Sequence, residues 1–163
     1  MTPLHVTLIL ATLLCSLVAG FLFAFAVVIM PGIGRLRDRE HIRAFQAMDR
    51  VIQDNDPLFM AVWVGSVLAL LAATVLAFGS PSGAVRWLTV GALAAYVLGV
   101  QLPTGAINVP LNNRLQALDV DATGEDAHRD ARQGFEGRWN RANTFRTVAC
   151  LVSATLMAVL AML

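Results

Sequence analysis

Polar side chains recur late in an otherwise apolar stretch of the chain. Gln101, Thr104 and Asn108 are spaced by three and four residues, so they share one face of a helix. Asn112 continues that face if the helix persists past the two nearby prolines. Amides and hydroxyls can hold the oxygen atoms of a ligand without carrying a charge themselves. We therefore expect these four side chains to bind part of a substrate.

A second polar face precedes the last apolar stretch. Glu136, Asn140, Asn143 and Thr147 step by four, three and four residues, and Arg146 lies beside them. A guanidinium can stabilise a developing oxyanion, and a carboxylate can accept a proton. If the two helices are neighbours, the two faces meet and form one polar pocket.

The same residues have a plainer interpretation. Amides in membrane helices often hydrogen-bond to neighbouring helices, for about 1 kcal/mol each. The long side chain of Arg146 can also extend its charged head to a membrane interface. Seven of these polar groups are expected to converge at one depth, so we favour a ligand pocket over helix packing. The seven are Gln101, Thr104, Asn108, Asn112, Glu136, Asn143 and Arg146.

The composition is typical of an integral membrane protein. Of the 163 residues, 57% are hydrophobic and 14% are charged, against about 25% charged in soluble chains. All the acidic residues and eleven of the twelve arginines lie within residues 31–57 and 108–146, and the chain has no lysine. The arginines alternate with acids and form no basic patch, so nucleic-acid binding is not predicted.

Four apolar stretches predict four membrane-spanning helices in a single domain, residues 1–163. The expected spans are residues 4–30, 58–78, 87–107 and 144–163, and the expected long loops are residues 31–57 and 108–143. Lipid offers no hydrogen-bond partners to the backbone, so the fold class is all-α, an integral membrane four-helix bundle. Pro103 is expected to kink the third span.

The arginines also predict an orientation. The two long loops, together with Arg146 just after the second, hold eleven of them, whereas the connection at residues 79–86 holds only Arg86. Arginine-rich loops stay on the cytoplasmic side. We therefore expect both long loops in the cytoplasm and both termini outside, in the plasma (inner) membrane.

The first long loop contains a helical pattern. Ile42, Phe45, Met48 and Ile52 recur at spacings of three and four residues. This periodicity predicts an amphipathic helix at residues 38–53, which lies along the membrane surface or caps the bundle. The small and acidic residues at 119–130 predict a mobile linker instead.

Cofactor chemistry finds little support in the sequence. The two cysteines lie at different depths and have no C-x-x-C spacing, which excludes the disulfide-forming class of membrane enzymes. His5 lies near the end of a span, and His41 and His128 lie in loops, so no pair of histidines faces a haem. We predict neither a cofactor nor a metal site.

Several short motifs follow one another along the chain. They are Gly20–Phe25, Val28–Gly32, Phe45–Met48, Asp56–Phe59, Asn108–Asn112 and Arg138–Thr147. Together they resemble the family of small four-span membrane proteins that includes the anthrone oxygenases. The resemblance implies oxidation of an anthrone to an anthraquinone by molecular oxygen, with no evident cofactor.

The resemblance also implies a set of site residues. By position it points to Asn108, Asn112, Trp139, Asn143 and Arg146. The chain departs from the family pattern at two positions, where Ala142 replaces a common aromatic residue and Thr144 replaces a common histidine. That histidine would be the obvious general base. The nearest replacements in the sequence are Glu136 and His41.

These observations lead to a hypothesis about function. Asn108, Asn143 and Arg146 would hold the phenolic or enolate oxygens, Trp139 would stack on the substrate ring, and Glu136 or His41 would accept the proton. The partners are a small hydrophobic aromatic substrate, molecular oxygen and the lipid bilayer. The alternative is a non-catalytic membrane protein that binds a lipid or quinone, or that serves as an assembly subunit.

A stripe of small residues in the third span raises the question of self-association. Gly91, Ala95 and Gly99 repeat at intervals of four, which is a spacing that lets helices approach closely. A homo-oligomer formed through this stripe is therefore a hypothesis.

Overall fold

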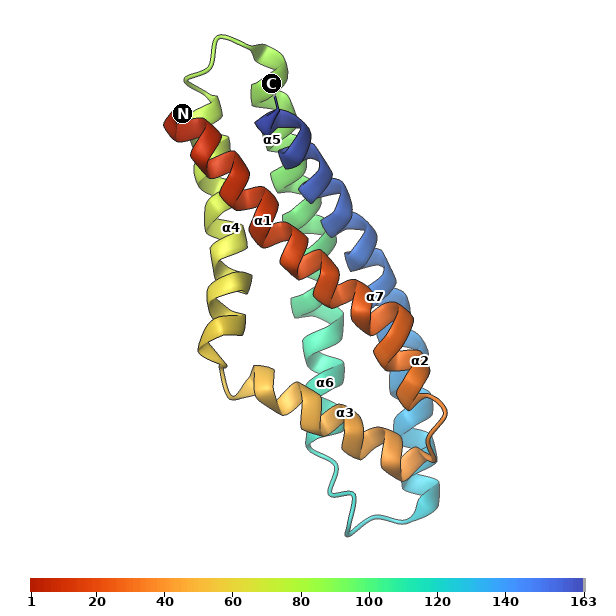
Figure 1. The fold of residues 1–163 in the computed structure, drawn as a ribbon. Coiled ribbons are helices and arrows are strands. Elements are labelled where there is room, and N and C mark those ends of the chain that lie inside the picture. The colour runs from red at the N-terminus through yellow and green to blue at the C-terminus, as the bar shows by residue number, and fades with distance from the viewer. Residues whose placement is uncertain (163) are drawn as a thin grey trace.

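The computed structural model describes residues 1–162, and every regular element in this part of the chain is a helix (Figure 1). Four helices are long and apolar enough to cross a membrane, namely Pro3–Ile33, Pro57–Ala77, Gly83–Gln116 and Glu125–Ala161. They run antiparallel, so that both ends of the chain lie at one end of the bundle (Figure 1). The prediction of an all-α bundle with four membrane-spanning helices is confirmed.

Three of these helices begin with defined caps. Thr2 accepts a hydrogen bond from the backbone N–H of His5 at 3.3 Å, before α1 (Pro3–Ala24). Asp56 caps α4 (Pro57–Ala77) in the same way, through the N–H of Phe59 at 2.8 Å. Ser82 caps α5 (Gly83–Tyr96). In α1 and α4 a proline follows the cap, where its missing N–H has no consequence for the helix.

The long helices contain π-helical segments, each placed just before a proline. These segments are η1 (Phe25–Ile29), η2 (Val97–Gln101) and η3 (Thr104–Asn108). They precede Pro31, Pro103 and Pro110, and each contains the residue four positions before its proline. A proline clashes with the carbonyl of that residue in a regular α-helix, and a wider turn relieves the clash. The helix therefore continues through Pro103 and Pro110 and carries Asn112 with it.

The expected loop at residues 108–143 is largely helical, which corrects that prediction. α6 (Val109–Gln116) extends the third span, and α7 (Glu125–Ala161) begins well before the predicted fourth span. Only residues 117–124 separate the two helices, and the second half of the expected linker is helical. The polar composition of these residues predicted a loop. The two helices instead continue beyond the apolar stretches of the sequence and still bury one face.

α3 (Asp38–Gln53) crosses the end of the bundle at the residues expected for a helix in the first long loop (Figure 1). It buries Ile42 and Phe45 against Leu111 of α6 and Phe135 of α7. Arg43 and Arg50 lie on its exposed side. α3 thus closes one end of the bundle, beside the residues of the polar faces.

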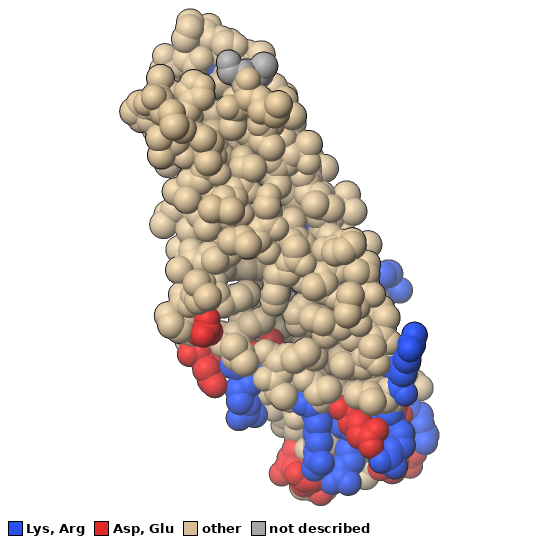
Figure 2. Space-filling view, viewed as in Figure 1, with Lys and Arg blue, Asp and Glu red and all other residues tan. Residues whose placement is uncertain are grey.

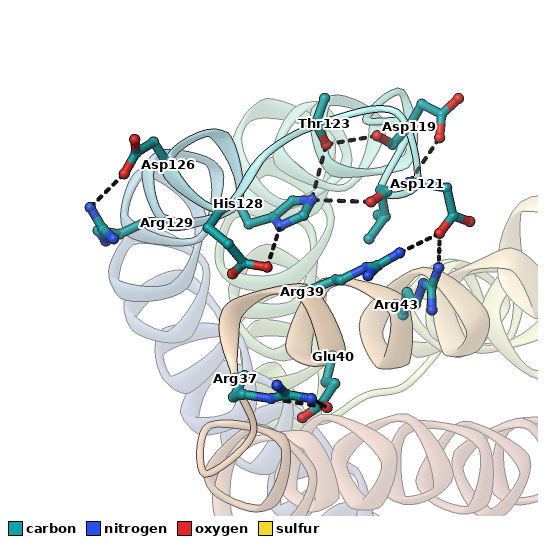
Figure 3. Close-up of polar contacts among 12 residues, drawn as sticks. Arg37, Arg39, Glu40, Arg43, Asp119, Asp121, Thr123, Asp126, His128 and Arg129 are labelled. Carbon is teal, nitrogen blue, oxygen red and sulfur yellow. Dashed lines mark hydrogen bonds and ion pairs between the residues drawn. The ribbon is translucent and has the colours of Figure 1, made fainter.

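The charged residues gather at the end closed by α3, while the rest of the visible surface carries almost no charged residues (Figure 2). Asp121, in the connection between α6 and α7, forms ion pairs with Arg39 and Arg43 of α3 (Figure 3). His128 holds the same connection, since its Nε2 lies 3.2 Å from the carbonyl of Val120. These contacts fasten the connection to α3.

The small-residue stripe contributes to packing within the bundle. A Cβ on Gly99 would lie 2.4 Å from Cβ of Ala149, so Gly99 permits the close approach of η2 and α7. The other glycine of the stripe, Gly91, has nothing within 4 Å of an added Cβ. Half of the proposed association seam is therefore occupied by the chain's own helix α7.

Candidate functional site

A cavity of about 370 Å³ lies between α3 and the adjoining ends of the long helices. Figure 2 shows a hollow in the apolar surface beside the charged end. Most of the cavity surface is apolar, and six of its lining residues are aromatic. The aromatic lining residues are Phe21, Phe25, Phe45, Phe59, Trp63 and Trp139. Such a wall suits a flat, apolar ring system.

One polar group in this wall is centred on Arg146, which is only 5% exposed. Its guanidinium donates to Oγ1 of Thr104 at 3.0 Å and to Oδ1 of Asn143 at 2.8 Å. Asn143 in turn donates to the carbonyl of Leu22 at 2.9 Å, which ties α7 to α1. Arg146, Asn143 and Thr104 form the guanidinium cluster. Its partners are all neutral, so the charge of Arg146 is not compensated by an acid within the cluster.

Two buried polar atoms near this cluster have unused hydrogen-bonding capacity. Within residues 1–162, neither Nε of Arg146 nor Oδ1 of Asn108 has a hydrogen-bond partner. Asn108 is 1% exposed and donates only a long hydrogen bond, of 3.4 Å, to the carbonyl of Trp139. Buried polar groups are normally satisfied. One unused donor and one unused acceptor on cavity-lining residues are what a ligand with adjacent keto and hydroxyl oxygens requires.

The second polar group is centred on Asp49 of α3, which is 3% exposed. Its carboxylate accepts from Nδ2 of Asn112 at 2.7 Å, from Nε2 of Gln53 at 2.8 Å and from Nε2 of Gln116 at 3.1 Å. These four residues form the carboxylate cluster. In the described chain the hydrogen-bond partners of Asp49 are all amides, and none is an arginine.

Trp139 connects the two clusters. Its indole Nε1 donates to Oδ1 of Asn112 at 2.8 Å, and its ring lies 5.6 Å from the guanidinium carbon of Arg146. Phe25 and Phe45 pack on the same indole at centroid distances of 5.6 Å. Because Trp139 is in contact on several sides, it links the position of the carboxylate cluster, through Asn112, to the position of Arg146.

Six of the nine residues proposed from the sequence line this cavity. They are Thr104, Asn108, Asn112, Trp139, Asn143 and Arg146. Gln101 does not line it, although Thr104 does. One π-helical segment ends at Gln101 and the next begins at Thr104, so the regular helical spacing assumed from the sequence is broken between them.

The two proposed proton acceptors also lie outside the cavity lining. Glu136 forms an ion pair with Arg132 at 2.8 Å, on another side of α7. His41 is fully buried at the start of α3, with Nδ1 3.2 Å from the carbonyl of Ile33. Burial lowers the pKa of His41 from its ordinary value, and the charge of Arg132 adds to that effect. The structure therefore does not bring either residue together with the guanidinium cluster.

Asp49 is the residue that sequence reasoning missed. It lies four residues after Phe45 and three before Ile52, which places it within the apolar stripe of α3. A lone carboxylate within an apolar stripe was the available signal. Such a residue needs a buried polar partner, and here α6 supplies Asn112 and Gln116.

Comparisons with known proteins place the chain in a family. The family model described as anthrone oxygenase matches residues 57–156, which is more than half of the chain. The match includes the guanidinium cluster, while Asp49 precedes it. No curated protein and no solved structure matches the chain significantly. On the strength of the family match, this chain belongs to the anthrone oxygenase family.

Proposed function

We propose that the protein is a membrane-embedded oxygenase that converts an anthrone, or a similar polycyclic phenol, to the corresponding quinone with molecular oxygen. One observation carries the proposal. Among residues 1–162, a cavity rich in aromatic residues contains a buried arginine without an acidic partner and a buried aspartate without a cationic partner, and family membership supports this reaction. The cavity volume lies within the range of roughly 300–1,000 Å³ that is usual for small-molecule sites.

The first step is removal of a proton from the CH₂ carbon of the substrate. The bond's electron pair passes into the ring system and leaves negative charge on the keto oxygen. Arg146, supported by Asn143, stabilises this oxyanion from within a site of low dielectric constant. The carboxylate of Asp49 takes the proton. No group from outside the chain is needed for this step.

Oxygen then reacts with the electron-rich carbon. A C–O bond forms, the oxygen molecule is reduced to a hydroperoxide, and the proton held by Asp49 returns to it. Loss of the second C–H proton and cleavage of the O–O bond release water and form the new carbonyl. One substrate and one O₂ thus yield one quinone and one H₂O.

Asp49 replaces the two proton acceptors that we inferred from the sequence. Its carboxylate lines the cavity, whereas Glu136 and His41 do not. The amides around Asp49 orient it without adding a charge.

The test is isotope labelling with the purified protein in detergent. With ¹⁸O₂ and an anthrone, we expect one labelled oxygen in each quinone and equal amounts of oxygen consumed and quinone formed. Heat-unfolded protein at the same concentration corrects for spontaneous oxidation. If the folded protein binds the anthrone and does not accelerate quinone formation, the oxygenase proposal is wrong and a non-catalytic ligand-binding protein is favoured.

A further inference from the structure

A groove on the outside of the bundle adjoins the cavity. It has a volume of about 250 Å³ and lies between α1 and α4. Three aromatic residues, Phe21, Phe59 and Trp63, line both the groove and the cavity. The two spaces therefore share these three side chains as parts of their walls.

The groove faces the lipid side of the bundle. Its outer residues include Leu17, which is 51% exposed, and Leu58, which is 74% exposed. Both residues belong to helices that are apolar and long enough to cross a membrane. A large apolar side chain left exposed on such a helix is in contact with acyl chains. Asp56, which caps α4, also lines the groove. The groove thus runs along the outer face of two membrane-spanning helices to the aromatic residues.

The three aromatic residues bridge a place where α1 and α4 diverge. Nearer the chain termini the two helices approach closely, since a Cβ on Gly65 would lie 3.3 Å from Cδ1 of Leu14. Toward α3 they separate (Figure 1). Phe21 meets Phe59 edge to face at 5.4 Å, and Phe59 stacks on Trp63 at 5.6 Å. Ring contacts of this kind allow side-chain rotation without breaking a hydrogen bond.

Another part of the cavity rim is polar. It is lined by Gln53, Asn55 and Asn113, which are all exposed at the charged end of the bundle. This rim suits water and protons. It offers no apolar contact to a flat ring system that is dissolved in a membrane.

We propose that the substrate reaches the cavity sideways from the bilayer, between Phe21, Phe59 and Trp63, which together form the lateral portal. This inference rests on the proposed function and narrows its substrate class. The substrate is an uncharged, planar, membrane-partitioned ring system that enters with its oxygen-bearing edge leading toward Arg146. A water-soluble conjugate of the same ring system is excluded by this route.

The test measures binding, not turnover. The probe is 1,8-dihydroxyanthraquinone, a planar phenol that is already oxidised. Its association and dissociation rates are measured by stopped-flow fluorescence with the protein in phosphatidylcholine vesicles. Leu17 and Leu58 line the groove and not the cavity, so Leu17→Trp fills the groove from its outer side, and Leu58→Trp is a second variant of the same kind. Asn113→Trp narrows the polar rim.

The matched control is Val152→Trp. Val152 is 47% exposed and lines another lipid-facing groove on α7, which shares no residue with the cavity. We expect Leu17→Trp to slow association and dissociation alike, by about tenfold, with unchanged affinity. Val152→Trp should behave as the wild type does, because Val152 does not lie on the route. Asn113 lines the cavity, so Asn113→Trp is judged by its association rate alone, which should not fall as it does in Leu17→Trp.

Two results would overturn the portal. In the first, Leu17→Trp and Leu58→Trp change the association rate of the probe no more than Val152→Trp does. In the second, only Asn113→Trp slows association, which would indicate access from water. Failure of the wild type to bind the probe would refute both the portal and the proposed site. Probe binding that is slowed by Leu17→Trp in a protein without oxygenase turnover would leave the portal standing and refute only the proposed reaction.

Discussion

Two arginines of the same helix have opposite surroundings. Arg132, at the charged end of α7, donates to the carboxylate of Glu136 at 2.8 Å and to that of Asp38 at 3.0 Å. It also donates to the carbonyl of Gly34 at 2.7 Å. Arg146, four turns further along, has only neutral hydrogen-bond partners in the described chain.

The difference separates structural charges from functional ones. At the charged end, cations meet acids and fix the connections between helices, as Asp121 does with Arg39 and Arg43 (Figure 3). In the cavity, Arg146 and Asp49 each rest on neutral groups. A buried charge without a counter-charge is unfavourable for stability. We infer that the two are retained because they act on a ligand.

The largest effect expected from this comparison is on turnover. Arg146→Gln keeps a polar side chain but removes the cation, so we expect kcat to fall about 10²- to 10³-fold. Oxygen uptake by the purified variant, with circular dichroism to show that it is folded, measures this. Arg132→Gln is the matched variant and should lower the thermal midpoint while its folded fraction keeps wild-type turnover. Equal losses of turnover in the two variants would show that Arg146 has no role in turnover that Arg132 lacks.

A smaller effect is expected where one residue positions two others. Asn112 contacts both Asp49 and Trp139, so Asn112→Ala should loosen both and lower kcat about ten- to a hundredfold. Asn140→Ala, on α7 outside the cavity lining, should leave kcat unchanged. The steady-state rates of the two alanine variants are compared directly. A normal rate for Asn112→Ala would show that Asp49 and Trp139 need no such support.

The pH dependence of stability sharpens the comparison at the end closed by α3. The pKa of His41 is lowered in the folded protein, chiefly by burial, so the unfolded chain binds a proton more readily. Stability is therefore full above the ordinary imidazole pKa and falls as the pH drops below it. Arg132 opposes protonation of His41, and Glu136 and Asp38 favour it.

Thermal unfolding in detergent between pH 7.5 and 5 measures this dependence. In His41→Gln the decline of the midpoint over that range should be shallower than in the wild type. An identical decline would mean that other groups cause it.

The smallest effect is expected from the exposed ion pairs. Asp121 is 72% exposed, and surface ion pairs contribute little because water and salt screen them. Asp121→Asn should leave both the thermal midpoint and turnover close to those of the wild type, as measured by the same two assays. A marked loss of turnover would show that the connection at residues 117–124 acts on the cavity through α3.

Much of the fold could be predicted from the sequence, because long apolar stretches leave few alternatives to helices. The lengths of the polar helices could not be predicted, because the charged residues within 108–143 are typical of a loop. These residues are helical in the structure, where one face of each helix packs against α3. Thr104, Asn108 and Asn112 remain together because helical spacing brings them close to one face. Gln101 departs from them because π-helical turns change the phase of the helix, and no pattern of residue types revealed that change.

The proton acceptor illustrates a different limit. Glu136 lies on the polar face that the sequence suggested, yet Arg132, one turn earlier, pairs with it on another side of α7. Asp49 enters the cavity only through the tertiary placement of α3 against α6. Spacing along α3 indicates that Asp49 needs a buried polar partner, but it does not identify that partner.

The most direct test of the account compares Asp49→Asn with Glu136→Gln in single-turnover quinone formation. Both substitutions remove one negative charge and preserve shape. If Asp49 takes the substrate proton, Asp49→Asn slows the reaction about 10²- to 10⁴-fold, as expected for loss of a general base, and Glu136→Gln reacts at the wild-type rate. A wild-type rate in Asp49→Asn together with a large loss in Glu136→Gln would show that Asp49 is not the general base.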